Sequence, residues 1–200
     1  MGTVYYGVHP RLNVEVAVKV LHPNLAIGQP ELIDRFFQEA QLAAQVHSPF
    51  LVGVLDVNQE ANLFYLVMEY VAGTTAAHCL VDALKVRKQG LDEREALQIA
   101  LAAGRGMAAA HQRGVVHRDI KPDNILIPYG ADGRSPAFGE AKLADLGIAR
   151  ATAQAAHVTQ DKLTLGTPGL MAPEQALDAK SAGPQADVFS LGATLYALLC

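Results

Sequence analysis

The residues best able to do chemistry gather in one stretch of the chain, VVHRDIKPDNILI at residues 115–127. Within eight positions it holds five side chains that can carry charge, exchange protons or bind ligands: His117, Arg118, Asp119, Lys121 and Asn124. Apolar residues flank this group on both sides, and so many polar groups between apolar runs are uncommon in an ordinary surface loop. Because each residue alone is common in loops, the prediction of a functional site depends on the combination.

This stretch resembles the catalytic loop of the eukaryotic-like protein kinases, in particular the bacterial serine/threonine protein kinases. The resemblance implies that Asp119 accepts or orients the proton of the substrate hydroxyl and that Asn124 holds Mg²⁺. Lys121 is similar to the lysine of serine/threonine kinases that contacts the transferring phosphate. The pattern therefore favours Ser and Thr hydroxyls over Tyr.

A second motif follows at the spacing this family would have. ADLG (144–147) resembles the metal-binding DFG element, with Leu146 in place of Phe, and Asp145 lies 21 residues after Asn124. The resemblance makes Asp145 the main Mg²⁺ ligand, and carboxylate oxygens suit this hard cation.

Upstream, VAVK (16–19) resembles the strand whose lysine binds the α- and β-phosphates of ATP. Lys19 lies among valines, and a buried ammonium needs a carboxylate near it to keep its charge. The resemblance points to Glu39, on the helix that follows, as this partner.

The adenine site is implied by YLVMEYV (65–71), which resembles the family's hinge. Met68 corresponds to the gatekeeper beside the base, and the backbones of Glu69 and Val71 would form hydrogen bonds with it. Three further apolar residues would enclose the base: Val4, Ala17 and Leu126.

Downstream, LGTPGLMAPEQA (165–176) resembles the substrate-binding segment, where Thr167 would contact Asp119 and Lys121. A phosphothreonine in the preceding loop could pair with Arg118, and Thr159 is the leading candidate. Asp187 would form hydrogen bonds with the catalytic-loop backbone.

The elements that must position these residues are predicted from hydrophobic periodicity and turn residues. We expect a hairpin of residues 3–8 and 14–21, a helix over 30–46, and two strands at 50–57 and 63–71. Two helices over 76–88 and 93–113, an exposed loop at 128–140 and a buried helix over 188–200 would follow. This order predicts an α+β, bilobal protein-kinase fold. Residues 1–71 would form a small antiparallel β lobe with one helix, and residues 72–200 a mainly helical large lobe.

Composition limits the alternatives. Half of the 200 residues are apolar and 18% are charged, as in a globular protein, and a net charge of −4 without a basic run argues against nucleic-acid binding. No signal peptide or membrane span is apparent, and the two isolated cysteines, Cys79 and Cys200, suit a reducing compartment. We therefore expect a cytoplasmic domain, whose parent protein could be anchored through other segments.

The resemblance predicts an ATP- and Mg²⁺-dependent signalling kinase that phosphorylates Ser and Thr of proteins, with autophosphorylation in a kinase dimer as one mode. Gly2-Thr3-Val4 matches only the end of the family's glycine-rich loop, and the chain stops at the central helix of the large lobe. The expectation is thus a catalytic domain truncated at both ends. The alternatives are a non-catalytic kinase-like scaffold and a small-molecule phosphotransferase.

Overall fold

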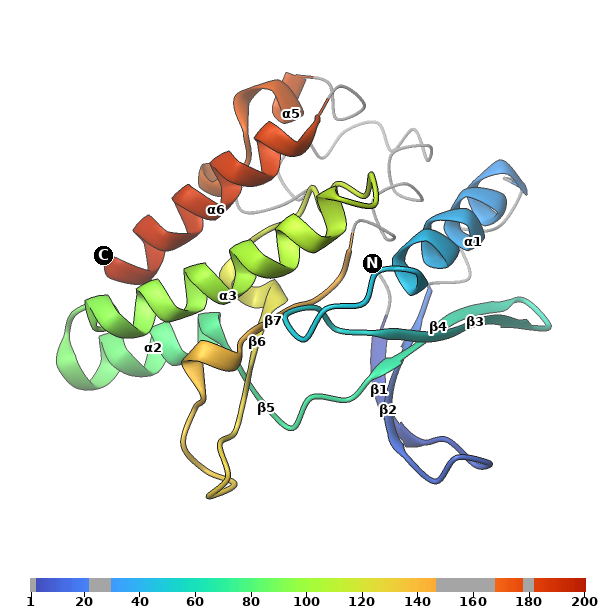
Figure 1. The fold of residues 1–200 in the computed structure, drawn as a ribbon, viewed down its shortest axis with the longest axis horizontal. Helices are drawn as coiled ribbons and strands as arrows, with labels where there is room; N and C mark the ends of the chain where they lie inside the picture. The colour runs from blue at the N-terminus through green and yellow to red at the C-terminus, as the bar shows by residue number, and fades with distance from the viewer. Residues whose placement is uncertain (1–2, 22–29, 147–167, 178–181) are drawn as a thin grey trace.

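The computed structural model describes residues 3–21, 30–146, 168–177 and 182–200, and their elements form two groups (Figure 1). One group is an antiparallel sheet of order β1-β2-β4-β3 with a single helix. Its elements are β1 (Thr3–Val8), β2 (Glu15–Val20), α1 (Pro30–Ala44), β3 (Val54–Glu60) and β4 (Leu63–Glu69). The predicted hairpin and the predicted α+β class are confirmed.

The other group is mainly helical, with a small sheet of order β5-β6-β7 between its helices and the first group (Figure 1). Its longer elements are β5 (Gly73–Thr75), α2 (Ala76–Arg87), α3 (Glu93–His111), β6 (Ile125–Pro128), β7 (Lys142–Leu143) and α6 (Pro184–Leu199). Its short helical turns are η2 (Pro122–Asn124), η3 (Phe138–Glu140), η4 (Pro168–Leu170) and α5 (Pro173–Leu177). The bilobal arrangement expected from the sequence is therefore present.

Helix α1 contacts the sheet through one apolar stripe. Phe36, Ala40 and Ala43 are at most 2% exposed, and their spacing of three to four residues places them on one helix face. They belong to the same core as Phe64 and Leu66 of β4. The stripe fixes the rotation of α1 and so decides where its polar residues lie.

The predicted strand over 50–57 differs from the structure, because β3 begins only at Val54. Residues 50–52 pair with the other lobe instead. The Leu143 N–H donates to the Phe50 carbonyl at 2.9 Å, and the Val52 N–H donates to the Leu143 carbonyl at 3.0 Å. An apolar run can pair with any strand edge that packing brings to it, and here this edge is β7.

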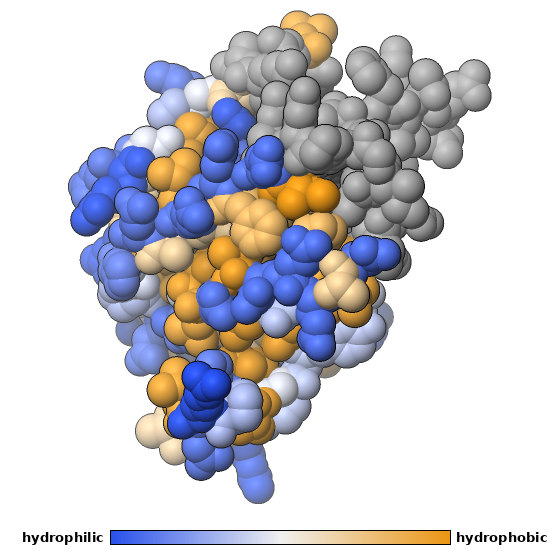
Figure 2. Space-filling model, turned by 90° about the vertical axis from the view of Figure 1, so that its right-hand side faces the viewer, coloured by the Kyte–Doolittle hydropathy of each residue, from blue (hydrophilic) through white to orange (hydrophobic). Residues whose placement is uncertain are grey.

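Helix α6 begins at Pro184 and has a buried face formed by Asp187, Ser190, Thr194 and Leu198. Its other face exposes large apolar residues, as does strand β1, where Val4, Tyr5, Tyr6 and Val8 are each at least 50% exposed. Figure 2 shows apolar surface bordered by polar residues on the face that lies to the right in Figure 1. Within the described ranges, no helix is long and apolar enough to cross a membrane.

Helix α3 contacts the 48–51 turn through a glycine. Gly106 is buried, and a Cβ there would overlap the carbonyl oxygen of Phe50. The neighbouring Arg105 guanidinium lies 5.3 Å from the centre of the Phe50 ring. This close approach seats the turn that carries residues 50–52.

Replacing Gly106 by alanine is expected to lower the free energy of unfolding by about 1–3 kcal/mol, because backbone must move to admit the methyl group. Gly104→Ala is the matched control on the same helix, since its Cβ would meet Leu191 at an ordinary 3.5 Å. The control should gain up to about 1 kcal/mol from helix propensity. Urea unfolding of both variants measures the difference, and equal midpoints would contradict the predicted clash.

Candidate active site

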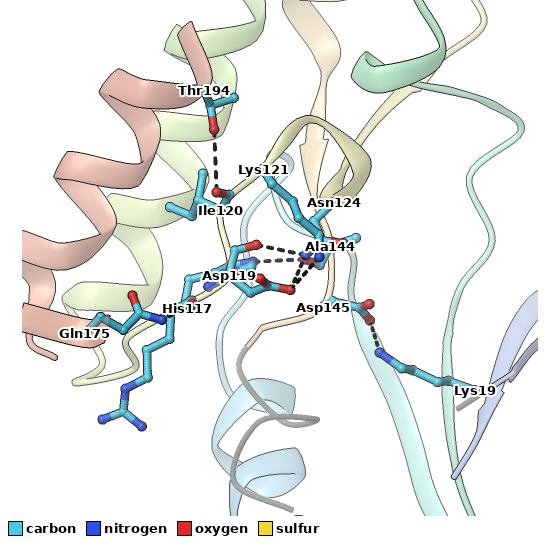
Figure 3. A network of polar contacts seen from close by, with 11 residues as sticks. Lys19, His117, Asp119, Ile120, Lys121, Asn124, Ala144, Asp145, Gln175 and Thr194 are labelled. Carbon is cyan, nitrogen blue, oxygen red and sulfur yellow. Dashed lines mark hydrogen bonds and ion pairs between the residues drawn. The ribbon is translucent and has the colours of Figure 1, made fainter. Parts of the chain in front are cut away.

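The catalytic-loop residues predicted from the sequence lie together (Figure 3). Oδ2 of Asp119 accepts a hydrogen bond from Nδ2 of Asn124 at 2.9 Å and lies 3.1 Å from Nζ of Lys121. The turn η2 folds the chain back between these residues, and Nδ2 of Asn124 also donates to the Asp119 carbonyl at 2.8 Å. The side chains of Asp119 and Lys121 are only 18% and 15% exposed, so a carboxylate and an ammonium face one another at the edge of solvent.

The buried carboxylate of Asp187 binds the backbone of the catalytic loop. Its Oδ1 accepts the Arg118 N–H at 2.6 Å, and its Oδ2 accepts the His117 N–H at 2.8 Å and lies 2.7 Å from Nε2 of His111. Arg118 has a left-handed backbone with φ of 63°, which is costly for a residue with a Cβ and persists only where contacts enforce it. The predicted contact of Asp187 with the catalytic-loop backbone is thus confirmed.

Two polar residues of this support were missed in the sequence. His111 is the last residue of α3, and Gln175, on α5, donates from Nε2 to the Arg118 carbonyl at 2.6 Å. Gln175 is 4% exposed. Their signal in the sequence is weak, because a polar residue at a helix end is usually solvated.

The buried ring of His117 connects the catalytic loop to the ADLG motif (144–147). Its Nε2 lies 2.8 Å from the Ala144 carbonyl, which can only accept, so Nε2 carries the proton. Its Nδ1 therefore accepts the Asp119 N–H at 3.2 Å. The neutral ring satisfies both neighbours, whereas a protonated ring would set a second N–H against that of Asp119.

Burial lowers the pKa of His117 below its ordinary 6.5, although Asp187, the Ala144 carbonyl, Asp119 and Asp145 all act to raise it. Below pH 6.5 the unfolded chain therefore binds a proton at His117 that the folded chain does not. We expect the free energy of unfolding to fall as the pH drops from 6.5 toward 5, by up to about 1.4 kcal/mol per pH unit for this group.

Urea unfolding at several pH values checks this expectation against His117→Phe, in which the titrating group is absent. The variant should be less stable than the wild type at pH 8, because two hydrogen bonds are lost, but its stability should depend less on pH between 6.5 and 5. Parallel pH profiles for the two proteins would contradict the assignment.

Asp145 lies two residues after the end of strand β7 and faces the small lobe (Figure 3). Its Oδ1 is 2.6 Å from Nζ of Lys19, whose side chain is 11% exposed. Asp145 has a left-handed backbone with φ of 62°, and the preceding Ala144 N–H donates to the Asn124 carbonyl at 2.8 Å. The backbone on either side of Ala144 thus ties Asp145 to the catalytic loop.

The carboxylate partner of Lys19 differs from the one predicted. The sequence points to Glu39, whereas the structure pairs the buried ammonium with Asp145. Because α1 is seated through Phe36, Ala40 and Ala43, Glu39 lies beside that stripe. There it lines a cavity of about 210 Å³ together with Leu42, Gly114, Val115, Val116, Arg118 and Leu146.

The residues predicted to bind the base divide into two sets. Met68 lies with Lys19 and Asp145 around one narrow pocket, which Leu146 also lines. The other apolar residues of the predicted base site do not line that pocket: Val4 on β1, Ala17 on β2 opposite Met68, Val71 after β4, and Leu126 on β6 opposite Lys142. Val4 is 54% exposed, whereas Ala17, Val71 and Leu126 contact the core. Thr167 and Thr159 lie outside the described residues.

The oxygen donors of this site are of the kind that suits a hard cation. Nδ2 of Asn124 donates to Asp119, so the amide oxygen of Asn124 would be the atom to coordinate a cation. Among the described residues no cluster of three or more His, Cys, Asp or Glu could hold a metal ion by itself. One carboxylate and one amide oxygen match Mg²⁺, which commonly takes one or two protein ligands and completes its shell with phosphate and water.

Comparison with known proteins gives a consistent result. The family described as "Protein kinase domain" matches residues 1–200. The serine/threonine-protein kinase PknA of Mycobacterium tuberculosis is 40% identical over 201 residues, covering 98% of this chain and 43% of PknA. The probable serine/threonine-protein kinase pknA2 of Bifidobacterium longum is 37% identical over 202 residues, covering 100% of this chain and 25% of that protein.

The solved structures agree with the sequence relatives. The crystal structure of the Mycobacterium tuberculosis PknI kinase domain superimposes with a TM-score of 0.75 at 28% identity, covering 100% of this chain and 69% of that one. The chain thus spans about a quarter of the length of pknA2 and less than half of the length of PknA.

Proposed function

This chain belongs to the protein kinase domain family, and from this premise we propose that it transfers the γ-phosphoryl group of ATP to serine and threonine hydroxyls of proteins. The observation that carries the proposal is the cluster in which Asp119 faces Lys121 and Asn124 beside the Lys19–Asp145 pair. The names of the relatives and the lysine at position 121 support Ser and Thr as acceptors.

In this proposal each polar residue has one role. Asp119 orients the acceptor hydroxyl and takes its proton, while Lys121 neutralises charge on the transferring group. Lys19 would hold the α- and β-phosphates, with Glu39 as the carboxylate partner that the family resemblance implies. Asn124 and Asp145 would hold Mg²⁺, which supplies charge neutralisation when bound.

The nucleotide would lie between a small lobe of residues 1–71 and a large lobe of residues 72–200. Its base would contact the backbones of Glu69 and Val71 beside Met68, with Val4, Ala17 and Leu126 around the ring. We extend the proposal to Thr167 as a contact of the acceptor hydroxyl, and to Thr159 as a site of autophosphorylation between two copies.

The proposal is tested by incubating the protein with γ-labelled Mg-ATP and a Ser- and Thr-rich protein substrate, followed by phosphoamino-acid analysis. We expect EDTA-sensitive label on phosphoserine and phosphothreonine. Nucleotide binding without any label would favour a non-catalytic scaffold, and label only on added small-molecule acceptors would favour a small-molecule phosphotransferase. Either outcome would overturn the proposed activity.

A further inference from the structure

The hinge carries a polar contact that the roles above do not use. Oε1 of Glu69 lies 2.8 Å from Nζ of Lys142, and Oε2 of Glu69 accepts the Gly53 N–H at 3.2 Å. Glu69 ends β4, Lys142 begins β7, and Gly53 directly precedes β3. A single carboxylate thus joins three segments that are distant in sequence, and we call Glu69, Lys142 and Gly53 the hinge clamp.

The clamp lies between the proposed base site and the proposed metal ligand. Lys142 is three residues before Asp145, on the strand whose next residue, Leu143, pairs with Phe50 and Val52. The main chain of Glu69 takes part as well, since its N–H donates to the Gly53 carbonyl at 2.9 Å. The position of the hinge is therefore coupled to the strand that leads to Asp145.

The far end of the hinge is anchored separately. The Tyr129 N–H donates to the Ala72 carbonyl at 3.0 Å, and Gly73 pairs with Pro128 in the β5–β6 ladder. Only Tyr70 and Val71 lie between Glu69 and this second anchor. Of the two backbone positions proposed to bind the base, Glu69 is thus at the clamp and Val71 is next to the second anchor at Ala72.

We propose that Glu69 and Lys142 are positioning residues for the nucleotide: their ion pair holds the hinge backbone at a set distance from Asp145. The proposal rests on the nucleotide binding proposed above. The side chains of Glu69 and Lys142 are 37% and 21% exposed, so water screens the pair only in part. A site that is already in its binding geometry loses less freedom on binding, and losing that order weakens affinity. For a partly exposed pair we expect about a two- to fivefold effect.

The test compares Lys142→Met with Arg87→Gln. The control breaks the Arg87–Glu95 pair, which has an N–O distance of 3.0 Å and side-chain exposures of 45% and 27% but lies within the large lobe. Two quantities are measured: amide hydrogen exchange without nucleotide, and the Kd for Mg-ADP by calorimetry. Lys142→Met should speed exchange in residues 50–54 and 69–73 and raise the Kd about two- to fivefold, whereas Arg87→Gln should change neither.

Two further variants distinguish positioning from general damage. Glu69→Gln loses the charge that pairs with Lys142, so it should weaken Mg-ADP binding. Because its amide oxygen can still accept the Gly53 N–H, amide exchange at Gly53 should change less than it would if both contacts of Glu69 were lost. Lys142→Arg keeps the charge and should restore both exchange and affinity toward the wild type. In phosphoryl transfer, the KM for ATP should rise in Lys142→Met with kcat nearly unchanged, because the Asp119 cluster is untouched.

The outcomes separate the two proposals. If the wild type binds no Mg-ADP, the proposed function fails, and the exchange data alone still decide whether the clamp holds the hinge. Unchanged exchange in Lys142→Met would overturn the clamp. Faster exchange with an unchanged Kd, or no recovery in Lys142→Arg, would overturn its role in positioning the nucleotide.

Discussion

Asp119→Asn is expected to lower the rate of phosphoryl transfer about 10²- to 10⁴-fold while leaving the Kd for Mg-ATP within about twofold. The asparagine oxygen can still accept from Nδ2 of Asn124 and face Nζ of Lys121, which now contact Oδ2 of Asp119 at 2.9 and 3.1 Å. The loop geometry should therefore persist. What is lost is the negative charge that orients the acceptor hydroxyl and takes its proton.

Single-turnover phosphorylation with saturating Mg-ATP measures this effect, and calorimetry gives the affinity. Asp123→Asn is the matched control, because Asp123 is an exposed carboxyl of the same loop and is turned to solvent. The control should keep the wild-type rate. Equal rates for Asp119→Asn and the wild type would remove Asp119 from the chemistry, and a large loss of nucleotide affinity would indicate that the site had been distorted.

Asp187→Ala is expected to cost about 3–5 kcal/mol of unfolding free energy, the largest stability effect in the described part of the chain that we predict. Asp187 is fully buried, and its two oxygens receive the N–H groups of His117 and Arg118 and face Nε2 of His111. Without the carboxylate, the buried His117 N–H and two part-buried donors, the Arg118 N–H and Nε2 of His111, lose their acceptor, and leaving a buried donor unsatisfied costs the desolvation of that group. The left-handed Arg118 would also lose the contact that enforces its backbone.

Urea unfolding provides the measurement. Asp82→Ala removes an exposed carboxylate of α2 that lies 3.5 Å from His78, and it should shift stability by less than about 0.5 kcal/mol. Asp187→Asn should be intermediate, because its amide oxygen replaces one acceptor while its NH₂ group faces a donor. A loss below about 1 kcal/mol for Asp187→Ala would show that the loop holds its shape without this carboxylate.

Most elements could be predicted because their signals are local. The 3–8 and 14–21 hairpin, the helix from Pro30 and the helices near 76 and 93 follow from period-2 and period-3.6 patterns, and they occur within a few residues of the predicted bounds. The same kind of local pattern predicts a strand at residues 50–52. Their pairing with Leu143 depends on a lobe that is distant in sequence, so no local pattern reports it.

The sequence by itself determined the family resemblance and the catalytic-loop cluster, because Asp119, Lys121 and Asn124 are so close along the chain that one turn brings them together. Only the tertiary structure decided which carboxylate lies beside Lys19, that His111 and Gln175 support the loop, and that Glu69 joins the hinge to β7. These contacts cross between elements that sequence spacing does not place. The packing of α1 against the sheet and the packing of the two lobes against each other decide which charged groups meet. A buried charge that has several possible partners in the sequence is therefore paired by the tertiary structure.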